Sequence, residues 1–346
     1  MAYDLTPVDG NCPICSSRQA ELLHTITSDF TAQYYALKES EPERHEKIKG
    51  EIERLWEGKE CRILRCRECG FIYADPFIAG DSPFYSLFYE NPKFPKWKWE
   101  YEETWQHLRN AVERGELEKP RVLEIGAGTG MFVSKIREIT SPDRIVTVEY
   151  SDAGKRAIEE MGIRCEQQDV TMLGEEFTEY FDAICMYQVL EHMTGLDEVF
   201  AKLYQLARPG GFLFVAVPGG DMLTLYEEKE AWLDNAPVHV SRWNEKSFRM
   251  IGEKHGWELE SYAIEPTGQL WKFLQFSLYK YVHRTKRSGT FYNWAESRKN
   301  RLLRYLFQVP LISYVALGSL GTIPTLTSPR MGSVQLVRFR KSESRP

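Results

Sequence analysis

A parallel, doubly wound seven-stranded α/β sheet, accompanied by a small N-terminal unit, is the fold class predicted for this chain of 346 residues. Three observations predict it. Strand-like and helix-like segments alternate from Arg121 onward, which is typical of a parallel sheet covered by helices. A glycine-rich turn follows the first of these strands, and two CxxC pairs lie near the N-terminus. The chain is therefore expected to contain two or three structural units.

The spacing of apolar residues predicts the individual elements. Seven strands are expected, at Arg121–Ile125, Arg144–Glu149, Ile163–Glu166, Phe181–Tyr187, Gly211–Val217, Trp257–Ile264 and Val334–Arg340. Helices are expected at Met131–Ile139, Asp152–Met161, Leu196–Ala207 and Glu245–His255, and in a charged insert at Glu41–Trp56. These elements suggest four consecutive segments: residues 1–83, a module with a helical insert; 84–118, a linker; 119–265, the sheet domain; and 266–346, an acceptor-side or lid segment that adds the last strand.

Composition limits the classes of function. The chain has 44 basic and 50 acidic residues and a net charge of −6, which argues against binding of bulk nucleic acid. Its N-terminus has neither a basic start nor an apolar core, so no signal peptide is expected. We therefore expect a cytoplasmic protein, with attachment to the inner face of the membrane as an alternative.

The segment Val122–Gly130, VLEIGAGTG, predicts a cofactor-binding turn. Glycine at Gly126, Gly128 and Gly130 permits positive φ and close approach of the backbone to a ligand. The dinucleotide fingerprint is GxGxxG, but here the pattern is ExGxGxG, and the bulky Met131 stands where the third glycine would be. This spacing disfavours a dinucleotide.

Two acids extend this turn into a site. Glu149 ends the second strand, 19 residues after Gly130, where a carboxylate can accept hydrogen bonds from ribose hydroxyls. Asp169 follows the third strand, where it can accept from the adenine amino group. Together they predict an adenosine slot, although either acid alone is equally compatible with an ordinary polar residue at a strand end.

Successive motifs in Arg121–Pro218 resemble those of class I S-adenosylmethionine-dependent methyltransferases: VLEIGAGTG, VEYS, Gln168-Asp169-Val170, YQVLEHM and RPGGFLFVAVP. The resemblance implies a Rossmann-like sheet that binds S-adenosylmethionine. It implies that the three glycines line the methionine part, Glu149 holds the ribose, Asp169 and Val170 hold the adenine, and Glu124 orders the amino end. It also implies that Ala127, Tyr150 and Gln188 contact the cofactor.

Candidate catalytic residues lie after the fourth strand and further along the chain. Methyl transfer needs positioning, and it needs a base only where a hydroxyl loses its proton. The candidates are His192, His239 and Glu191. Methyltransferases that resemble the ubiquinone O-methyltransferases and small-RNA 2′-O-methyltransferases carry ExxEH here and hold a metal. Gln188 replaces the first Glu, which puts metal dependence in doubt, and leaves Glu191, His192 and His239 as a weaker candidate for a divalent-metal site. Glu191 is also explained as a residue that shapes the loop.

The two CxxC pairs, Cys12 with Cys15 and Cys66 with Cys69, predict a tetrahedral Zn²⁺ site with four thiolates and a structural role. A redox pair or bystander thiols are the alternative. CPIC…CRECGFIYADP and FYSLFYENP resemble the zinc ribbon and linker of a methyltransferase subgroup tied to sugar and surface-polysaccharide modification. This resemblance implies a sugar or glycoconjugate acceptor. Cys61 is a weaker candidate ligand.

Two further segments have functional interpretations. The aromatic-rich segment Phe84–Trp105 suggests a lid or a docking surface. Between Lys280 and Arg304 the chain has eight Lys or Arg and one acid, Glu296, and the apolar stretch Leu302–Leu320 follows. A basic run beside an apolar helix can contact an anionic membrane. We favour the alternative of a helix packed on the sheet or covering the acceptor pocket.

The sequence thus predicts a methyltransferase that uses S-adenosylmethionine and acts on a hydroxyl of a small molecule, sugar, glycoconjugate or lipid-linked precursor. Transfer to carbon or nitrogen is an alternative. A catalytically silent binding or scaffold protein is another. An NAD-dependent oxidoreductase is disfavoured by the glycine spacing and by the lack of a Tyr-xxx-Lys pair after the fourth strand.

Overall fold

The computed structural model describes residues 5–87, 97–231, 235–298 and 300–342 and comprises two compact units. The first unit contains Met1–Asn91, Gly219–Asn244 and Pro266–Ser333. The second contains Pro92–Pro218, Glu245–Glu265 and Val334–Pro346. Each unit is therefore built from three separate stretches of chain. The division into four consecutive segments, which the sequence suggested, remains a prediction.

A seven-stranded sheet forms the centre of the second unit, in the order β11-β12-β9-β8-β5-β6-β7. Its strands are β5 Val122–Ile125, β6 Ile145–Val148, β7 Arg164–Glu166, β8 Phe181–Tyr187, β9 Ala207–Pro218, β11 Trp257–Ile264 and β12 Val334–Lys341. Five of them, β5 to β9, pair in parallel. The predicted seven-stranded α/β fold is confirmed.

The sheet is parallel except at one edge. Strand β12 lies between β9 and β11 and runs antiparallel to both, with Val337 opposite Val215 and Tyr262. The alternation of strands and single helices predicts parallel pairing only where a crossover helix joins two strands. The connection that precedes β12 instead runs through the first unit, from Pro266 to Ser333.

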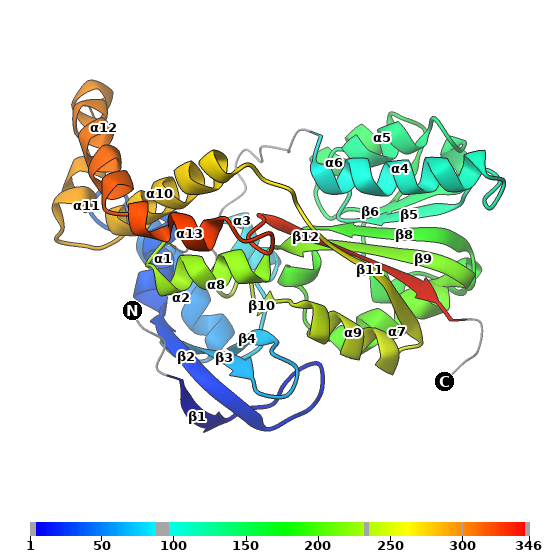
Figure 1. The fold of residues 1–346 in the computed structure, drawn as a ribbon, viewed down its shortest axis with the longest axis horizontal. Coiled ribbons are helices and arrows are strands. Elements are labelled where there is room, and N and C mark those ends of the chain that lie inside the picture. Colours follow the sequence, from blue (N-terminus) through cyan, green and yellow to red (C-terminus); the bar gives the residue numbers. More distant parts are fainter. Residues whose placement is uncertain (1–4, 88–96, 232–234, 299, 343–346) are drawn as a thin grey trace. The chain divides into compact units, whose positions relative to one another are not determined.

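Helices cover both faces of this sheet (Figure 1). On one face lie α4 Trp99–Glu113, α5 Met131–Ile136 and α6 Asp152–Glu159, and on the other lie α7 Leu196–Leu206 and α9 Glu245–Lys254. Short 3₁₀ turns occur at Pro142–Arg144, Val170–Met172, Glu175–Phe177 and Leu190–His192. The doubly wound arrangement places the carboxyl ends of the parallel strands, where ligands bind in such sheets, along one edge.

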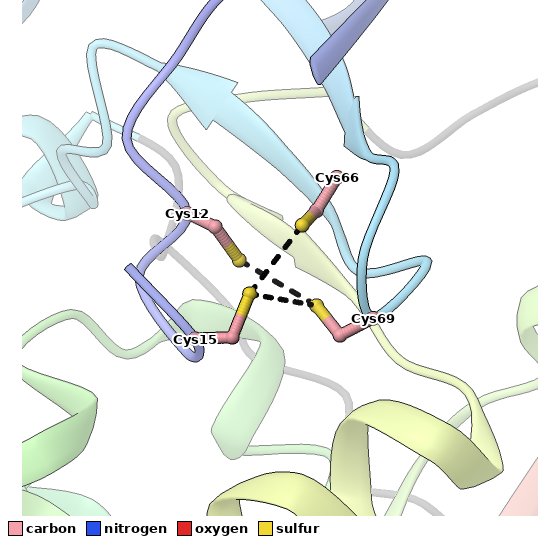
Figure 2. A group of neighbouring side chains, drawn as sticks. All are labelled: Cys12, Cys15, Cys66 and Cys69. Atoms are coloured by element: carbon pink, nitrogen blue, oxygen red, sulfur yellow. Dashed lines mark hydrogen bonds between the residues drawn. The ribbon is translucent and has the colours of Figure 1, made fainter. Parts of the chain in front are cut away.

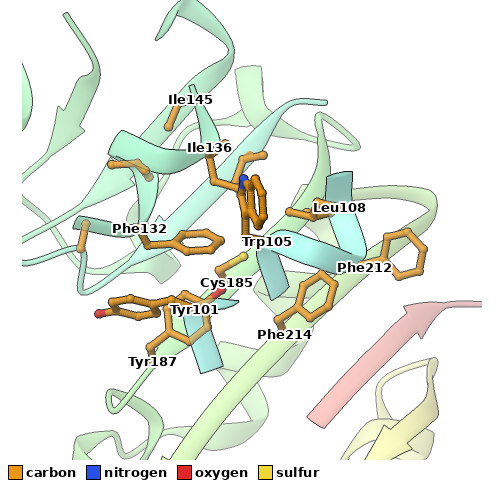
Figure 3. Close-up of a cluster of buried hydrophobic side chains, with 14 of the residues drawn as sticks. Tyr101, Trp105, Leu108, Phe132, Ile136, Ile145, Cys185, Tyr187, Phe212 and Phe214 are labelled. Carbon is orange, nitrogen blue, oxygen red and sulfur yellow. The ribbon is translucent and has the colours of Figure 1, made fainter. Parts of the chain in front are cut away.

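Aromatic side chains of α4 pack into the core of the second unit (Figure 3). The Tyr101 ring lies 4.8 Å from the Tyr187 ring and 5.6 Å from the Phe132 ring, between centroids, and Trp105 is also buried. These aromatic residues therefore belong to the core and not to an exposed docking surface. Phe88, Tyr89 and Phe94 lie outside the described residues, and the lid role of the segment stays a prediction.

A five-stranded antiparallel sheet organises the first unit, in the order β1-β2-β3-β4-β10. Its strands are β1 Thr6–Asp9, β2 Gln19–Thr27, β3 Glu60–Cys66, β4 Ile72–Asp75 and β10 Ser241–Arg242. Its helices are α1 Ser28–Tyr35, α2 Pro42–Trp56, α3 Ser82–Ser86, α8 Gly220–Glu228, α10 Gln269–Thr285, α11 Phe291–Glu296, α12 Arg301–Leu317 and α13 Ile323–Leu326, with a 3₁₀ turn at Leu320–Thr322. Strand β10 pairs with β4 although more than 160 residues separate them.

The charged insert between the CxxC pairs is helical, as predicted. Helix α2 begins with Pro42, whose fixed φ and missing N–H suit the first turn of a helix. Its apolar residues Ile48, Ile52 and Leu55 follow helical spacing and are buried. They pack in a core that also includes Phe84 of α3 and Val240, just before β10. The N-terminal unit therefore has a hydrophobic core of its own.

Candidate functional site

The glycine turn follows β5 and has the predicted conformation. Gly126, Gly128 and Gly130 have φ values of 72°, 56° and 75°. A Cβ added at Gly126 would lie 2.3 Å from Cγ2 of Val189, and one added at Gly130 would lie 2.4 Å from Cε of Met161. Gly126 therefore requires glycine for conformation and for space, and Gly130 requires it for conformation. Ala127, between the first two glycines, is buried.

Glu149 connects this turn to the start of α6. One carboxylate oxygen, Oε2, accepts from the Gly128 N–H at 2.8 Å, and Oε1 accepts from the Ser151 N–H at 2.8 Å. Gly154 permits the approach, since a Cβ there would lie 2.4 Å from the Gly128 carbonyl oxygen. A carboxylate oxygen has two lone pairs, so Glu149 keeps acceptor capacity for the hydroxyls of a ligand.

Glu124 is a carboxylic acid enclosed in the core below the turn. It is 1% exposed, and burial raises its pKa to about 8, with the negative charge of Glu149 adding to the rise and a backbone hydrogen bond from Val133 opposing it. Within the described part of the chain, its Oε2 atom has no hydrogen-bond partner. An acceptor left unpaired in the interior is costly, so this atom favours a ligand that brings a donor. The ammonium group of a methionine moiety is such a donor.

Asp169 and Tyr150 are brought together at the ends of β6 and β7. Asp169 Oδ2 accepts from the Tyr150 hydroxyl at 3.2 Å, and Oδ1 accepts from the N–H and the hydroxyl of Thr171 at 2.8 and 2.6 Å. Tyr150 remains 63% exposed, whereas the side chain of Val170 is buried. The predicted adenine end therefore combines an oriented carboxylate with an exposed aromatic ring.

The residue after β8, Gln188, adjoins a carboxyl group that sequence analysis missed. Gln188 has a φ of 59°, unusual for a residue with a side chain, and its N–H donates to the Ala216 carbonyl oxygen at 2.8 Å. Glu100, at the start of α4, is 2% exposed; burial raises its pKa, while Lys98 and the Gln188 side chain oppose the rise. Lys98 Nζ lies 3.7 Å from Glu100 Oε1. The only hint in the sequence was an acid among the aromatic residues of this segment.

The predicted catalytic residues are divided between the two units. Glu191 is buried and His192 is half-buried, and both lie in the 3₁₀ turn Leu190–His192 of the second unit. His239 lies in the first unit, before β10, where its N–H donates to the Asn235 carbonyl oxygen at 3.1 Å. Their catalytic roles, and a divalent-metal site shared by them, stay predictions.

The four predicted cysteines converge in the first unit (Figure 2). Cys12 Sγ lies 3.5 Å from Cys69 Sγ, and Cys15 Sγ lies 3.5 Å from Cys66 Sγ and 3.7 Å from Cys69 Sγ. Four sulfurs bound tetrahedrally to zinc at about 2.3 Å would be about 3.8 Å apart. The spacing therefore fits a tetrahedral ion with every position filled by protein. All four are free cysteines without a disulfide.

The backbone around each pair also suits a metal. Cys12 C=O accepts from the Ser16 N–H at 3.0 Å, and Cys66 C=O accepts from the Gly70 N–H at 2.9 Å. Ser16 and Gly70 both have positive φ, so the two pairs form matching turns. A hydrogen bond from the Cys69 thiol lowers the pKa of Cys12 to about 5, aided by backbone N–H groups and opposed by burial. This direction favours the thiolate, which is the form that binds a metal.

The remaining cysteines lie apart from this cluster. Cys61 is fully buried in β3 among core side chains, outside the group of four converging sulfurs, and burial raises its pKa. Cys165 and Cys185 are core residues of the second unit, as predicted. The cysteine turn also receives a contact missed by sequence analysis: Asn244 Nδ2 donates to the Cys69 carbonyl oxygen at 3.3 Å.

Known proteins resemble part of this chain. Residues 97–262 match the family model of a methyltransferase domain. Over 111 residues the chain is 30% identical to the ubiquinone biosynthesis O-methyltransferase of Pseudomonas putida strain GB-1, which covers 30% of this chain and 46% of that protein. The chain thus spans about half the length of the curated relatives that it matches.

Two solved structures match part of this chain at low identity. A SAM-dependent methyltransferase from Archaeoglobus fulgidus has 16% identity and a TM-score of 0.43, covering 70% of this chain and 94% of that one. Phosphoethanolamine N-methyltransferase 2 from Haemonchus contortus, in complex with S-adenosyl-L-methionine, has 17% identity and a TM-score of 0.40, covering 69% and 53%. Residues 97–262 are thus similar to a methyltransferase domain, and this match includes the glycine turn, Glu149 and Asp169.

Proposed function

We propose that this protein is an S-adenosylmethionine-dependent methyltransferase whose cofactor binds at the carboxyl ends of β5, β6 and β7. The observation that carries the proposal is the hydrogen bond between the Gly128 N–H and Glu149, which joins the glycine turn to the predicted ribose acceptor inside the matched methyltransferase domain. S-adenosylmethionine supplies an electrophilic methyl group when it is bound.

The residues of the turn fit the parts of this cofactor. The unpaired oxygen of Glu124 would accept from its ammonium group, and Glu149 would accept from its ribose hydroxyls. Asp169 would accept from the adenine amino group, beside the Tyr150 ring. Backbone groups freed by the glycines would border the methionine part. Each part of the cofactor is thereby matched with a group of suitable chemistry on this chain.

Oxygen is the proposed methyl acceptor, as a hydroxyl of a sugar, glycoconjugate or lipid-linked precursor. The curated relatives are named O-methyltransferases of ubiquinone biosynthesis, which supports oxygen as the acceptor atom. The sugar class rests on the resemblance of the N-terminal cysteine module and linker to those of polysaccharide-modifying enzymes. His192, Glu191 and His239 are the candidates for removing the hydroxyl proton or orienting the acceptor.

We also propose that Cys12, Cys15, Cys66 and Cys69 hold a structural Zn²⁺. Thiolate ligands at all four positions leave none open for water or substrate, so this ion would stabilise the fold of the first unit and take no part in the chemistry.

Isothermal titration of the purified protein with S-adenosylmethionine tests the cofactor assignment. Saturable binding is expected, and Gly128→Arg should abolish it because an arginine side chain would occupy the turn. Glu159→Gln, on the exposed side of α6, should bind like the wild type. Wild-type protein that binds no S-adenosylmethionine would contradict the proposal. Binding without methyl transfer to any component of a cell extract would instead favour a silent binding protein.

The acceptor requires a separate experiment. Cell extract incubated with the protein and S-adenosylmethionine labelled in its methyl group should yield a labelled product, identified by mass. Alkali-stable methyl ether on a sugar is the expected linkage. Label on a carbon or a nitrogen atom would overturn O-methylation while leaving the cofactor assignment intact.

A further inference from the structure

Helix α12 in the first unit exposes its apolar residues. Leu302, Leu306, Val309 and Leu317 are 71%, 62%, 64% and 67% exposed, and their spacing places them along one side of the helix. Val315 is the one residue of α12 that is fully buried. A helix on the surface of a water-soluble protein has the opposite arrangement, with its apolar stripe toward the core.

Two polar residues of α12, Arg304 and Gln308, instead contact an acid inside the unit. Gln308 Nε2 donates to Glu296 Oε2 at 2.9 Å, and Arg304 Nη1 lies 4.0 Å from Glu296 Oε1. Glu296 belongs to α11, and its Oε2 also accepts from the Tyr281 hydroxyl of α10 at 3.3 Å. These contacts lie within the unit, where α12 packs on α10 and α11 (Figure 1). Polar groups inside and apolar groups outside are typical of a surface that faces lipid.

Charge and aromatic residues around α12 fit the surface of an anionic bilayer. Eight Lys or Arg accompany the single acid Glu296 between Lys280 and Arg304. Arg301 begins the helix and is exposed, and Trp294 and Tyr305 are 41% and 57% exposed. Basic residues are attracted to an anionic membrane surface, and Trp and Tyr favour the interface between headgroups and acyl chains.

The length of α12 favours an interfacial position. Its 17 residues extend about 25 Å, less than the hydrocarbon thickness of a bilayer. Across the described ranges, no single helix is long and apolar enough to cross a membrane. Arg301–Leu317 and Leu320–Leu326 are long and apolar enough only when taken together, and they are bent by 46° at the break between them.

We propose that α12 lies in the interface of a phospholipid bilayer with anionic headgroups, its Leu302–Leu317 side buried at the acyl boundary. The sequence interpretation had favoured a helix packed on the sheet. The exposed leucines and the inward Gln308–Glu296 contact now favour the membrane. This proposal does not depend on methyl transfer, because a lipid surface is recognised by α12 whether or not a cofactor is bound.

Sedimentation of the full-length protein with vesicles tests the proposal. Vesicles of phosphatidylcholine alone are compared with vesicles that also contain phosphatidylglycerol, at low salt. The wild type is expected to bind the anionic vesicles at least about tenfold more tightly. Leu306→Glu should weaken this binding about tenfold or more, because it places a charge on the side of α12 that is proposed to lie in the membrane. Met172→Glu, which adds the same charge at a methionine 69% exposed in the second unit, is the control and should bind like the wild type.

A second variant tests the electrostatic part. Arg298→Gln combined with Arg301→Gln should reduce binding to anionic vesicles about tenfold at low salt and change binding to neutral vesicles little. Three results would overturn the proposal: no binding of the wild type to anionic vesicles, equal binding by Leu306→Glu, or a wild-type dimer in sedimentation equilibrium that Leu306→Glu dissociates without any vesicle binding. The last would assign this side of α12 to a second copy of the chain. S-adenosylmethionine titration of the same samples reports separately on the proposed function.

Discussion

The glycine turn and the cysteine cluster are held in place by different interactions. In the turn, backbone N–H groups of Gly128 and Ser151 already occupy the Glu149 carboxylate, and the chain holds the geometry without a ligand. In the cysteine cluster, four sulfurs lie 3.5 to 3.7 Å apart in the measured pairs, and backbone hydrogen bonds shape each pair separately. Hydrogen bonds between thiols, such as Cys12 with Cys69, connect the two pairs, and a bound ion would replace them with stronger bonds. The cofactor site is thus preorganised by the fold, whereas the proposed metal would add bonds between the two cysteine pairs.

The largest expected effect is therefore at the cysteines. Cys69→Ser should abolish zinc binding and unfold or loosen the first unit, because structural zinc contributes about 10 to 16 kcal/mol of apparent binding free energy at neutral pH. Zinc content by atomic absorption and protease sensitivity measure the two effects. Cys61→Ala, which removes a buried thiol outside the cluster, should keep one zinc per chain. Wild-type protein that is purified without zinc and cannot bind it would contradict the proposed zinc site.

The next largest effect concerns the pH dependence of stability in the second unit. Burial raises the pKa of Glu124 to about 8, so the folded state holds a proton that the unfolded state releases near pH 4.5. Stability contributed by this proton is full below about pH 4.5 and is lost as pH rises toward 8, by about 3 to 5 kcal/mol.

Replacing this acid checks the sign. Glu124→Gln stays neutral throughout, so urea unfolding should show a flatter dependence on pH between 5 and 8 for this variant than for the wild type. Addition of S-adenosylmethionine should reduce the loss in the wild type, since an ammonium donor lowers the pKa of Glu124 again. Identical pH profiles for the variant and the wild type would remove Glu124 from the cofactor site as described.

A smaller effect distinguishes the cost of backbone conformation from the cost of steric overlap in the glycine turn. Gly126 and Gly115 both have φ above 70°, but a Cβ would meet Val189 at Gly126 and nothing within 4 Å at Gly115. Gly115→Ala should cost about 1 to 2 kcal/mol for the backbone alone. Gly126→Ala should cost about 1 to 3 kcal/mol more and weaken cofactor binding. Urea unfolding and cofactor titration measure both. Equal costs would mean that Val189 moves aside freely.

The smallest expected effect is at Glu149. Glu149→Gln keeps one acceptor for the turn but removes the charge, so affinity for S-adenosylmethionine should fall about tenfold while unfolding changes by about 1 kcal/mol. Glu159→Gln removes a carboxylate of α6 that does not contact the glycine turn. It should change neither the affinity nor the free energy of unfolding by more than experimental error. A large loss of stability in Glu149→Gln, with affinity unchanged, would make this residue a structural clamp only.

Regular patterns allowed much of the second unit to be predicted. Alternating strands and helices predicted β5 to β9, and the spacing of Gly126, Gly128 and Gly130 predicted a turn that the structure confirms. Such patterns reflect local backbone geometry, which depends on neighbours a few residues away. The antiparallel course of β12 was missed because strand direction there is set by partners far along the chain, β9 and β11.

The amino-acid sequence by itself determined the two local chemistries of this protein: a glycine turn with its acids, and two CxxC turns with free thiols. Tertiary structure alone decided that residues from Ser241 to Asn244 complete the N-terminal sheet and contact Cys69, that Gln188 adjoins Glu100, and that the apolar side of α12 is exposed. The physical reason is range. Turns and helices arise from nearby residues, whereas these contacts join residues 88 to 175 positions apart or depend on which side of a helix finds a packing partner.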